Sequence, residues 1–120
     1  MEVAVIDGAE PRLKTSIWVQ AQIRLCDLNF IPAVIARRGD PDGGVVLVRL
    51  VRGRNENLLL RRQARLDGGA DWVAVSGDAP LDDAEIDSRI AREVSRDRDL
   101  WVLEVDDPKR RYWPDRPIEA

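Results

Sequence analysis

Between residues 33 and 76, short apolar runs alternate with clusters of turn-forming residues, and this pattern constrains the fold more than any other feature. The runs have the length of strands and are rich in Val, Ile and Leu, whereas Gly, Asp, Asn and Pro between them favour turns. The pattern predicts an antiparallel meander of four strands, in which residues 33–52 form a β-hairpin. The expected strands are AVIAR (33–37), VVLVRLVR (45–52), NLLLRRQARL (57–66) and WVAVS (72–76), and the turns are GDPDGG (39–44), GRN (53–55) and DGGAD (67–71).

A helix is predicted after the meander. Ile86, Ile90 and Val94 recur at a spacing of four, which places them on one helical face. Asp82 stands where an N-cap is expected, and the acids of the first turn and the arginines of the last complement the helix dipole. LWVLEV (100–105) then has the length and composition of a fifth strand.

The segment after Pro11 admits two interpretations. Apolar residues at positions 13, 17, 21, 25 and 28 predict an amphipathic helix, with Thr15 or Ser16 as its cap. Val19, Ala21, Ile23 and Leu25 also alternate with polar residues, which is typical of a strand. We favour the helix, because the longer stripe supports it and because Ala, Gln, Arg and Leu are good helix formers.

The expected order is therefore α-β-β-β-β-α-β, an α+β fold. We expect a five-stranded, mainly antiparallel sheet with both helices packed on one face, since such a sheet can leave its other face to solvent. Residues 1–10 are predicted to be a loose lead-in, 11–107 a single α+β domain and 108–120 a polar Pro-rich tail. Tyr112 and Trp113 are the candidates to hold the tail against the domain.

The amino-acid composition argues against several kinds of catalytic and metal-binding site. The 120 residues contain no histidine and one cysteine, Cys26, which argues against a catalytic triad, a Cys-His pair, an ordinary zinc site and an internal disulfide. Asp40 and Asp42 supply too few oxygens for calcium. We expect no cofactor, no metal and no catalytic residue, although enzymatic activity stays uncertain. An acidic start and short apolar runs predict neither a signal peptide nor a membrane span, so we expect a cytoplasmic protein that does not bind membranes.

Three segments carry a resemblance to a known family: PRLKTSIWVQA (11–21), RRGDPDGGVVLV (37–48) and DRDLWVLEVDD (97–107). Together they resemble domain of unknown function 1491, a family of short, mostly alphaproteobacterial proteins. The first and third segments are the specific ones, and the segment around 54–66 departs from the pattern. The resemblance implies a bacterial cytoplasmic protein and a single domain over 11–107. It implies no catalytic residue, because the family has no assigned activity.

Arg12, Lys14 and Trp18 form the first candidate site. If a helix starts near Ser16, its free N–H groups and two cations would make an anion pocket. The alternative is that the cations pair with acids of the second helix or of the last strand. Trp18 lies beside the apolar stripe rather than on it, which makes it either a core residue or an interface anchor.

A basic face is the second candidate site. Residues 37–65 hold eight arginines against three acids, whereas residues 67–107 hold thirteen acids against four arginines. Arg61 and Arg65 share one face of the predicted third strand, with Arg49 or Arg52 beside them. Nucleic-acid binding is nevertheless disfavoured, because residues 31–71 contain no aromatic side chain and the pI is near 5.0. The alternative is that the two charged regions compensate each other in space.

The function predicted from sequence is a non-enzymatic module that binds a protein partner or itself. A homodimer is favoured over other partners, because an open sheet leaves two edges that can pair with another strand. A small-anion or ligand binder that uses Arg12 and Lys14 is the alternative, and a nucleic-acid binder that uses the Arg-rich sheet face comes third.

Overall fold

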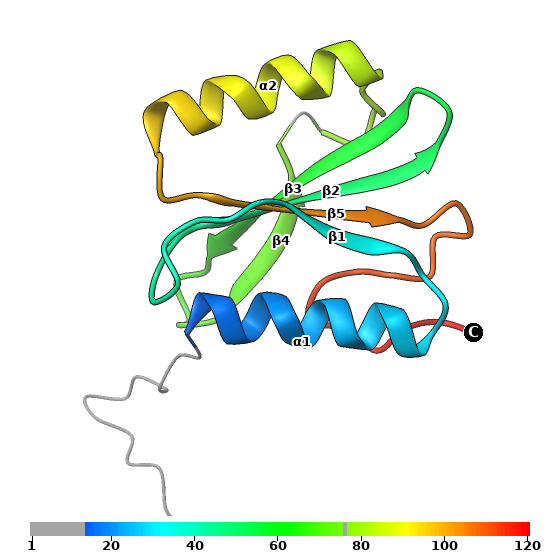
Figure 1. The fold of residues 1–120 in the computed structure, drawn as a ribbon, viewed down its shortest axis with the longest axis horizontal. Helices are drawn as coiled ribbons and strands as arrows, with labels where there is room; N and C mark the ends of the chain where they lie inside the picture. Colours follow the sequence, from blue (N-terminus) through cyan, green and yellow to red (C-terminus); the bar gives the residue numbers. More distant parts are fainter. Residues whose placement is uncertain (1–13, 76) are drawn as a thin grey trace, which may run out of the picture.

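A computed structural model describes residues 14–75 and 77–120 of the chain. A five-stranded sheet lies between two helices, in the strand order β1-β5-β2-β3-β4 (Figure 1). The α+β class, the order of elements along the chain and the mainly antiparallel sheet predicted from sequence are confirmed. The elements are α1 (Thr15–Leu28), β1 (Ala33–Arg37), β2 (Val46–Gly53), β3 (Glu56–Ala64), β4 (Ala70–Ala74), α2 (Asp83–Arg96) and β5 (Trp101–Asp106).

The predicted hairpin over residues 33–52 is wrong, because β5 lies between its two strands. β5 pairs antiparallel with β1 and parallel with β2, with Leu103 opposite both Ile35 and Val48. β5 is buried along most of its length, whereas alternate side chains of β1 are exposed. A strand that is apolar on both faces gains most at the centre of a sheet, and the less buried β1 suits the edge. β2, β3 and β4 form the antiparallel meander that the sequence predicted.

The two helices cover opposite faces of the sheet, and the prediction that both pack on one face is wrong (Figure 1). α1 contributes Val19 and Cys26 to a large core with the even-numbered apolar residues of β2 and β3. α2 contributes Ile86 to a smaller core with Leu47 and Leu59. The physical reason lies in β2 and β3, whose consecutive apolar residues point to both faces, so that each face needs a cover.

The helix predicted near residue 15 is confirmed, but its buried face differs from the predicted stripe. Ile17 and Leu28 are exposed, whereas Val19, Gln22 and Cys26 are buried. Tertiary packing orients α1 so that only part of the predicted apolar stripe faces the core. α2 agrees with the sequence more closely, since Asp82 caps it within a complete capping box.

The C-terminal tail packs against the α1 side of the core. Tyr112 is 1% exposed, and its hydroxyl donates to the Gln22 side-chain oxygen at 2.6 Å. The buried Asp107 carboxylate accepts from the backbone N–H groups of Arg111 and Tyr112. Trp113 packs on the same core, so the folded unit extends beyond residue 107. Over the described ranges, no helix has the length and apolar character needed to cross a membrane.

Candidate functional site

The N-terminus of α1 docks on the turn at residues 39–44. The Ser16 N–H donates to the Pro41 carbonyl at 3.0 Å, and the Thr15 hydroxyl donates to the Gly44 carbonyl at 3.0 Å. The Lys14 Nζ lies 3.7 Å from the Asp42 carboxylate. Protein groups therefore take up part of the anion pocket predicted here, and Lys14 pairs with the turn rather than with α2 or β5. Arg12, the other predicted cation, lies outside the described residues.

Trp18 takes part in a carboxylate clamp that sequence reasoning missed. Its ring stacks on Trp72 with a centroid distance of 5.3 Å and an interplanar angle of 17°. Both indole N–H groups donate to the two oxygens of Asp115, at 2.9 Å from Trp18 and 2.8 Å from Trp72. Asp115 thereby ties the tail to α1 and β4. No local signal could have paired residues 97 positions apart in the chain.

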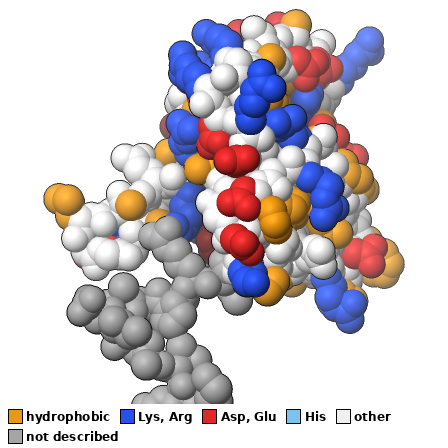
Figure 2. Space-filling model, turned by 60° about the vertical axis from the view of Figure 1, so that its left-hand side comes forward, with side chains coloured by type: hydrophobic (Ala, Val, Ile, Leu, Met, Phe, Trp, Pro, Cys, Tyr) orange, Lys and Arg blue, Asp and Glu red, His pale blue; other side chains and the backbone are white. Residues whose placement is uncertain are grey.

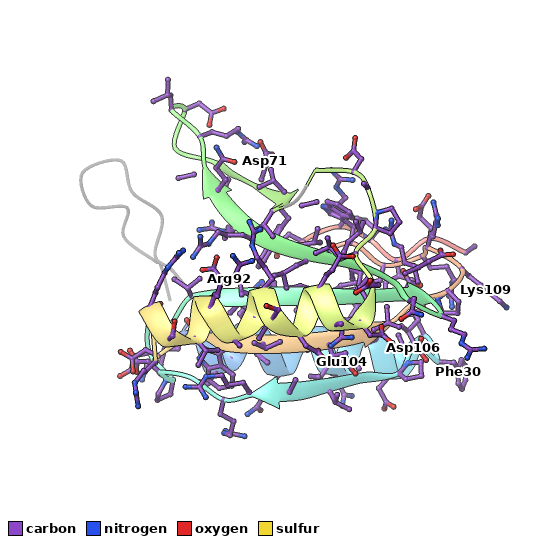
Figure 3. The ribbon with its side chains drawn as sticks, turned by 90° about the horizontal axis from the view of Figure 1, so that it is seen from above. Phe30, Asp71, Arg92, Glu104, Asp106 and Lys109 are labelled. Carbon is purple, nitrogen blue, oxygen red and sulfur yellow. The ribbon has the colours of Figure 1, made fainter. Side chains whose placement is uncertain are left out.

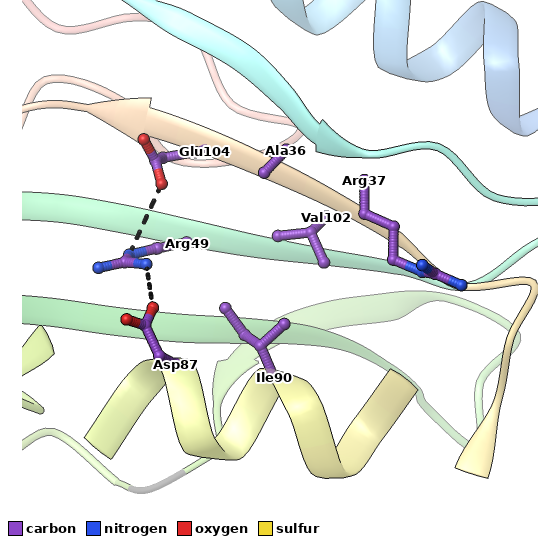
Figure 4. A pocket seen from close by; sticks show the side chains of 7 residues that line it. All are labelled: Ala36, Arg37, Arg49, Asp87, Ile90, Val102 and Glu104. Carbon is purple, nitrogen blue, oxygen red and sulfur yellow. Dashed lines mark hydrogen bonds and ion pairs between the residues drawn. The ribbon is translucent and has the colours of Figure 1, made fainter. Parts of the chain in front are cut away.

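Arg49 is a largely buried cation that is paired with acids of α2 and β5. Its side chain is 15% exposed, and it lies 2.8 Å from Asp87 and 3.5 Å from Asp83 of α2. Its Nε also lies 3.8 Å from Glu104 and donates to Asn57 at 3.2 Å (Figure 4). The guanidinium thus joins β2 to β5 and to the acidic first half of α2.

The other two predicted basic-face residues are paired as well. Arg61 lies 3.2 Å from Glu93 of α2, and Arg65 lies 3.1 Å from Asp67 and 2.6 Å from Asp71 in the β3–β4 hairpin. Acidic segments compensate these arginines in space, which was the alternative to a basic face. At these three positions, the pairing reduces the positive charge that could attract a nucleic acid.

A set of cations that sequence reasoning did not single out lies on α2. Arg89, Arg92 and Arg96, together the α2 arginine cluster, line a hollow of about 190 Å³ with Glu93. In Figure 2, Lys and Arg side chains gather in the upper part of the view, above a column of Asp and Glu. The sequence did contain a signal for this cluster, because spacings of three and four residues place the three arginines on one helical face.

Three of the exposed large apolar side chains lie between the end of α1 and the first half of β1, the edge strand beside β5. Phe30 is 94% exposed, Val34 is 55% exposed and Leu28 is exposed nearby. Phe30 has a φ of 59° at the end of α1, a conformation that favours glycine and costs a bulky residue about 1 kcal/mol. Within residues 14–75 and 77–120, no segment covers these apolar side chains.

A small hollow of about 170 Å³ adjoins β1 on the α2 side of the sheet (Figure 4). Its charged groups are Arg49, Asp87 and Glu104, which pair with one another, and Arg37, whose guanidinium donates to the Arg98 carbonyl at 2.9 Å. Ala36, Ile90 and Val102 line the rest. Its paired charges give the hollow no strong preference for either sign of ligand.

The described ranges contain no group of three or more His, Cys, Asp or Glu side chains placed to hold a metal ion. Burial raises the pKa of the Cys26 thiol to about 11, with a smaller contribution from Asp107, so the thiol stays protonated and unreactive near neutral pH. Burial likewise raises the pKa of Tyr112. Neither group is thereby prepared to act as a nucleophile or base.

The fold and its surfaces define a small α+β protein with a mixed five-stranded sheet between two helices and an exposed apolar edge at β1. The chain belongs to the DUF1491 family of proteins of unknown function, whose family model matches residues 13–113. The resemblance found in the sequence is thereby confirmed. No curated protein matches the sequence significantly.

Three solved structures share the fold. A crystal structure of a DUF1491 family protein from Caulobacter crescentus CB15 has a TM-score of 0.78 and 33% identity, over 90% of this chain and 100% of the other. An NMR structure of a DUF1491 family protein from the same organism has a TM-score of 0.75 and 32% identity, over 92% and 100%. The solution structure of protein Atu0922 from A. tumefaciens has a TM-score of 0.67 and 23% identity, over 80% and 86%, and supports the fold alone.

Proposed function

We propose that this protein is a non-enzymatic module of the bacterial cytoplasm that associates with a second copy of itself through β1. The observation that carries the proposal is an edge strand with exposed apolar side chains, Val34 and Ala36, and no charge before Arg37. Edge strands of monomeric proteins are commonly protected by charged side chains, proline or coverage. The first four residues of β1 include no charged residue and no proline, and no other strand of the described residues pairs with their outer edge.

The backbone of β1 supports pairing at two positions. The Pro32 carbonyl, just before β1, accepts from the Asp106 N–H, so the backbone polar groups at this register point toward β5. Because these groups alternate along an antiparallel pair, those of Val34 also point to β5, and those of Ala33 and Ile35 point to the free edge. A second β1 strand running antiparallel would satisfy both positions, with Ala33 of one copy opposite Ile35 of the other.

This register places a two-fold axis at Val34. The two copies of Val34 would then lie directly opposite each other as a non-hydrogen-bonded pair, with Cα atoms about 4.5 Å apart. Their side chains would cover each other on the α2 side of the joined sheet, where Val34 is otherwise exposed. The β1 bulge between Ile35 and Arg37 ends the pairing, which keeps the added ladder short.

The opposite edge, β4, is less suited to this role. It carries Asp71, which pairs with Arg65 of β3. Its side chains alternate between the buried Trp72 and the more exposed Val73. A charge at the middle of an edge disfavours pairing between identical strands, because two like charges would approach each other.

Cysteine cross-linking tests the register. In a Cys26→Ala background, Val34→Cys should form a disulfide-linked dimer under mild oxidation, because the expected Cα separation lies within the range of roughly 4.4–6.8 Å that disulfides need. Val73→Cys at the β4 edge is the matched control and should cross-link much more slowly.

Light scattering over a concentration series tests the association itself. The unmodified chain should approach the mass of a dimer, and Val34→Lys should shift it toward the monomer while Val73→Lys does not. A chain that stays monomeric at high micromolar concentration, or equal cross-linking from the two cysteines, would refute the proposal.

A further inference from the structure

The α2 arginine cluster gathers positive charge on a protein whose net charge is −3. Its three members follow one another at intervals of three and four residues and border one hollow. Figure 3 shows Arg92 on the side of α2 that faces the β3–β4 hairpin, where Asp71 lies farther out. The cluster therefore forms a surface separate from β1, toward the side of the sheet where β3 and β4 lie.

The carboxylate that lines the hollow is already paired. Glu93, which also lines the hollow, pairs with Arg61 at 3.2 Å, and Asp71 pairs with Arg65 at 2.6 Å. Arg89 donates to the Val75 carbonyl at 3.3 Å, which holds its guanidinium against the end of β4. Within residues 14–75 and 77–120, no carboxylate lies within 4.0 Å of Arg89, Arg92 or Arg96.

Helix stability alone does not account for the cluster. A cation near the C-terminus of a helix is favoured by the helix dipole, which explains Arg96 in the last turn. The effect falls off within that turn, so it does not reach Arg89. Like charges three and four residues apart repel one another on a helix surface, and an anion between them would relieve the repulsion.

We propose that the α2 arginine cluster binds the phosphate group of a small phosphorylated molecule. Guanidinium groups bind phosphate through paired, charge-assisted hydrogen bonds, and they stay charged at every physiological pH. Arg89 is held in place by β4, and Arg92 and Arg96 can close on the same group from one helical face. The Arg61–Glu93 pair removes the repulsion that a free carboxylate in the hollow would exert.

A titration with inorganic pyrophosphate, followed by the backbone and arginine side-chain signals in NMR spectra, tests this site. Sodium chloride holds the ionic strength constant, because nonspecific attraction weakens with salt. The variant is Arg92→Gln with Arg96→Gln. Its control is Arg24→Gln with Arg54→Gln, which removes the same charge from exposed positions elsewhere. A nucleoside diphosphate in a second series shows whether the ligand is a bare or an esterified phosphate.

We expect saturable shifts centred on residues 89–96, an affinity reduced about tenfold or more in the cluster variant, and little change in the control. Shifts that grow linearly without saturating, or an equal loss in the two variants, would overturn the proposal. Binding of an acidic peptide or an RNA without binding of pyrophosphate or the nucleotide would overturn it as well. None of these outcomes depends on self-association, which the β1 variants test separately.

Discussion

The hydrogen bond between Tyr112 and Gln22 allows a sharp test of how the C-terminal tail contributes to stability. The Tyr112 hydroxyl is buried and donates to a buried amide oxygen at 2.6 Å. Tyr112→Phe removes the donor but keeps the ring, and Gln22→Leu removes the acceptor but keeps similar volume. The double variant removes both partners and leaves a largely apolar contact between α1 and the tail.

The expected loss of stability depends on which buried polar group each substitution leaves without a partner. A buried polar group without a partner costs about 1–3 kcal/mol, whereas replacing both partners by apolar groups can be nearly neutral. Because both side chains are buried here, we expect each single variant to lose about 2 kcal/mol and the double variant about 1 kcal/mol. The coupling energy of the pair is then about 3 kcal/mol, at the upper end of what contacting residues show.

Urea denaturation of the four proteins provides the assay. With a slope of about 1.3 kcal/mol/M for a domain of this size, a loss of 2 kcal/mol lowers the midpoint by about 1.5 M. The slopes should agree among the four proteins, which validates the comparison. If Tyr112→Phe changes stability by less than about 0.5 kcal/mol, or if the single effects simply add, the tail is not part of the cooperative unit and the reasoning fails.

Three further predictions concern the caps, the clamp and the buried thiol. Asp82→Ala should lower the free energy of unfolding by about 1 kcal/mol in urea, since it breaks the capping box of α2, whereas Asp78→Ala should not. Asp115→Asn should cost about 1–2 kcal/mol and alter tryptophan fluorescence, because the amide is neutral and has one oxygen, so both indole N–H groups lose the charged acceptor and one is left with no acceptor; unchanged emission would contradict the clamp. Burial raises the pKa of Cys26 from 9.0 to about 11, so the native state keeps a proton that the unfolded chain has lost. The free energy of unfolding should therefore fall by roughly 2 kcal/mol between about pH 9 and 11, with a shallower slope in Cys26→Ala.

The secondary structure was largely predictable because its signals are local. The turn predicted at 53–55 falls at residues 54–55 between β2 and β3, and Asp82 caps α2 by accepting a hydrogen bond from the Glu85 N–H, three residues away. Such interactions involve neighbours in the chain, so their pattern can be read without knowledge of the fold. The resemblance to the DUF1491 family was readable for a similar reason, since it rests on short segments such as residues 11–21.

The candidate sites were predicted less well, because a side chain's neighbours in space determine whether it is available. Arg49 and Arg61 were rightly placed on strands, but their charge is matched by acids of α2 that lie more than thirty residues away. Trp18 was singled out from the sequence, but its partners Trp72 and Asp115 could not be named from sequence. The α2 arginines became a candidate binding site only after the structure showed that the acidic side chain beside them is paired with another residue.

The sequence by itself determined which segments form helices and strands, where the turns fall and which family the chain resembles, because propensity, capping and periodicity act over a few residues. Only the tertiary structure decided that β5 lies between β1 and β2, that the helices cover opposite faces and that the tail packs on α1. Those outcomes depend on burying apolar surface from distant segments at once, as when Leu103 packs between strands that the sequence had joined in a hairpin.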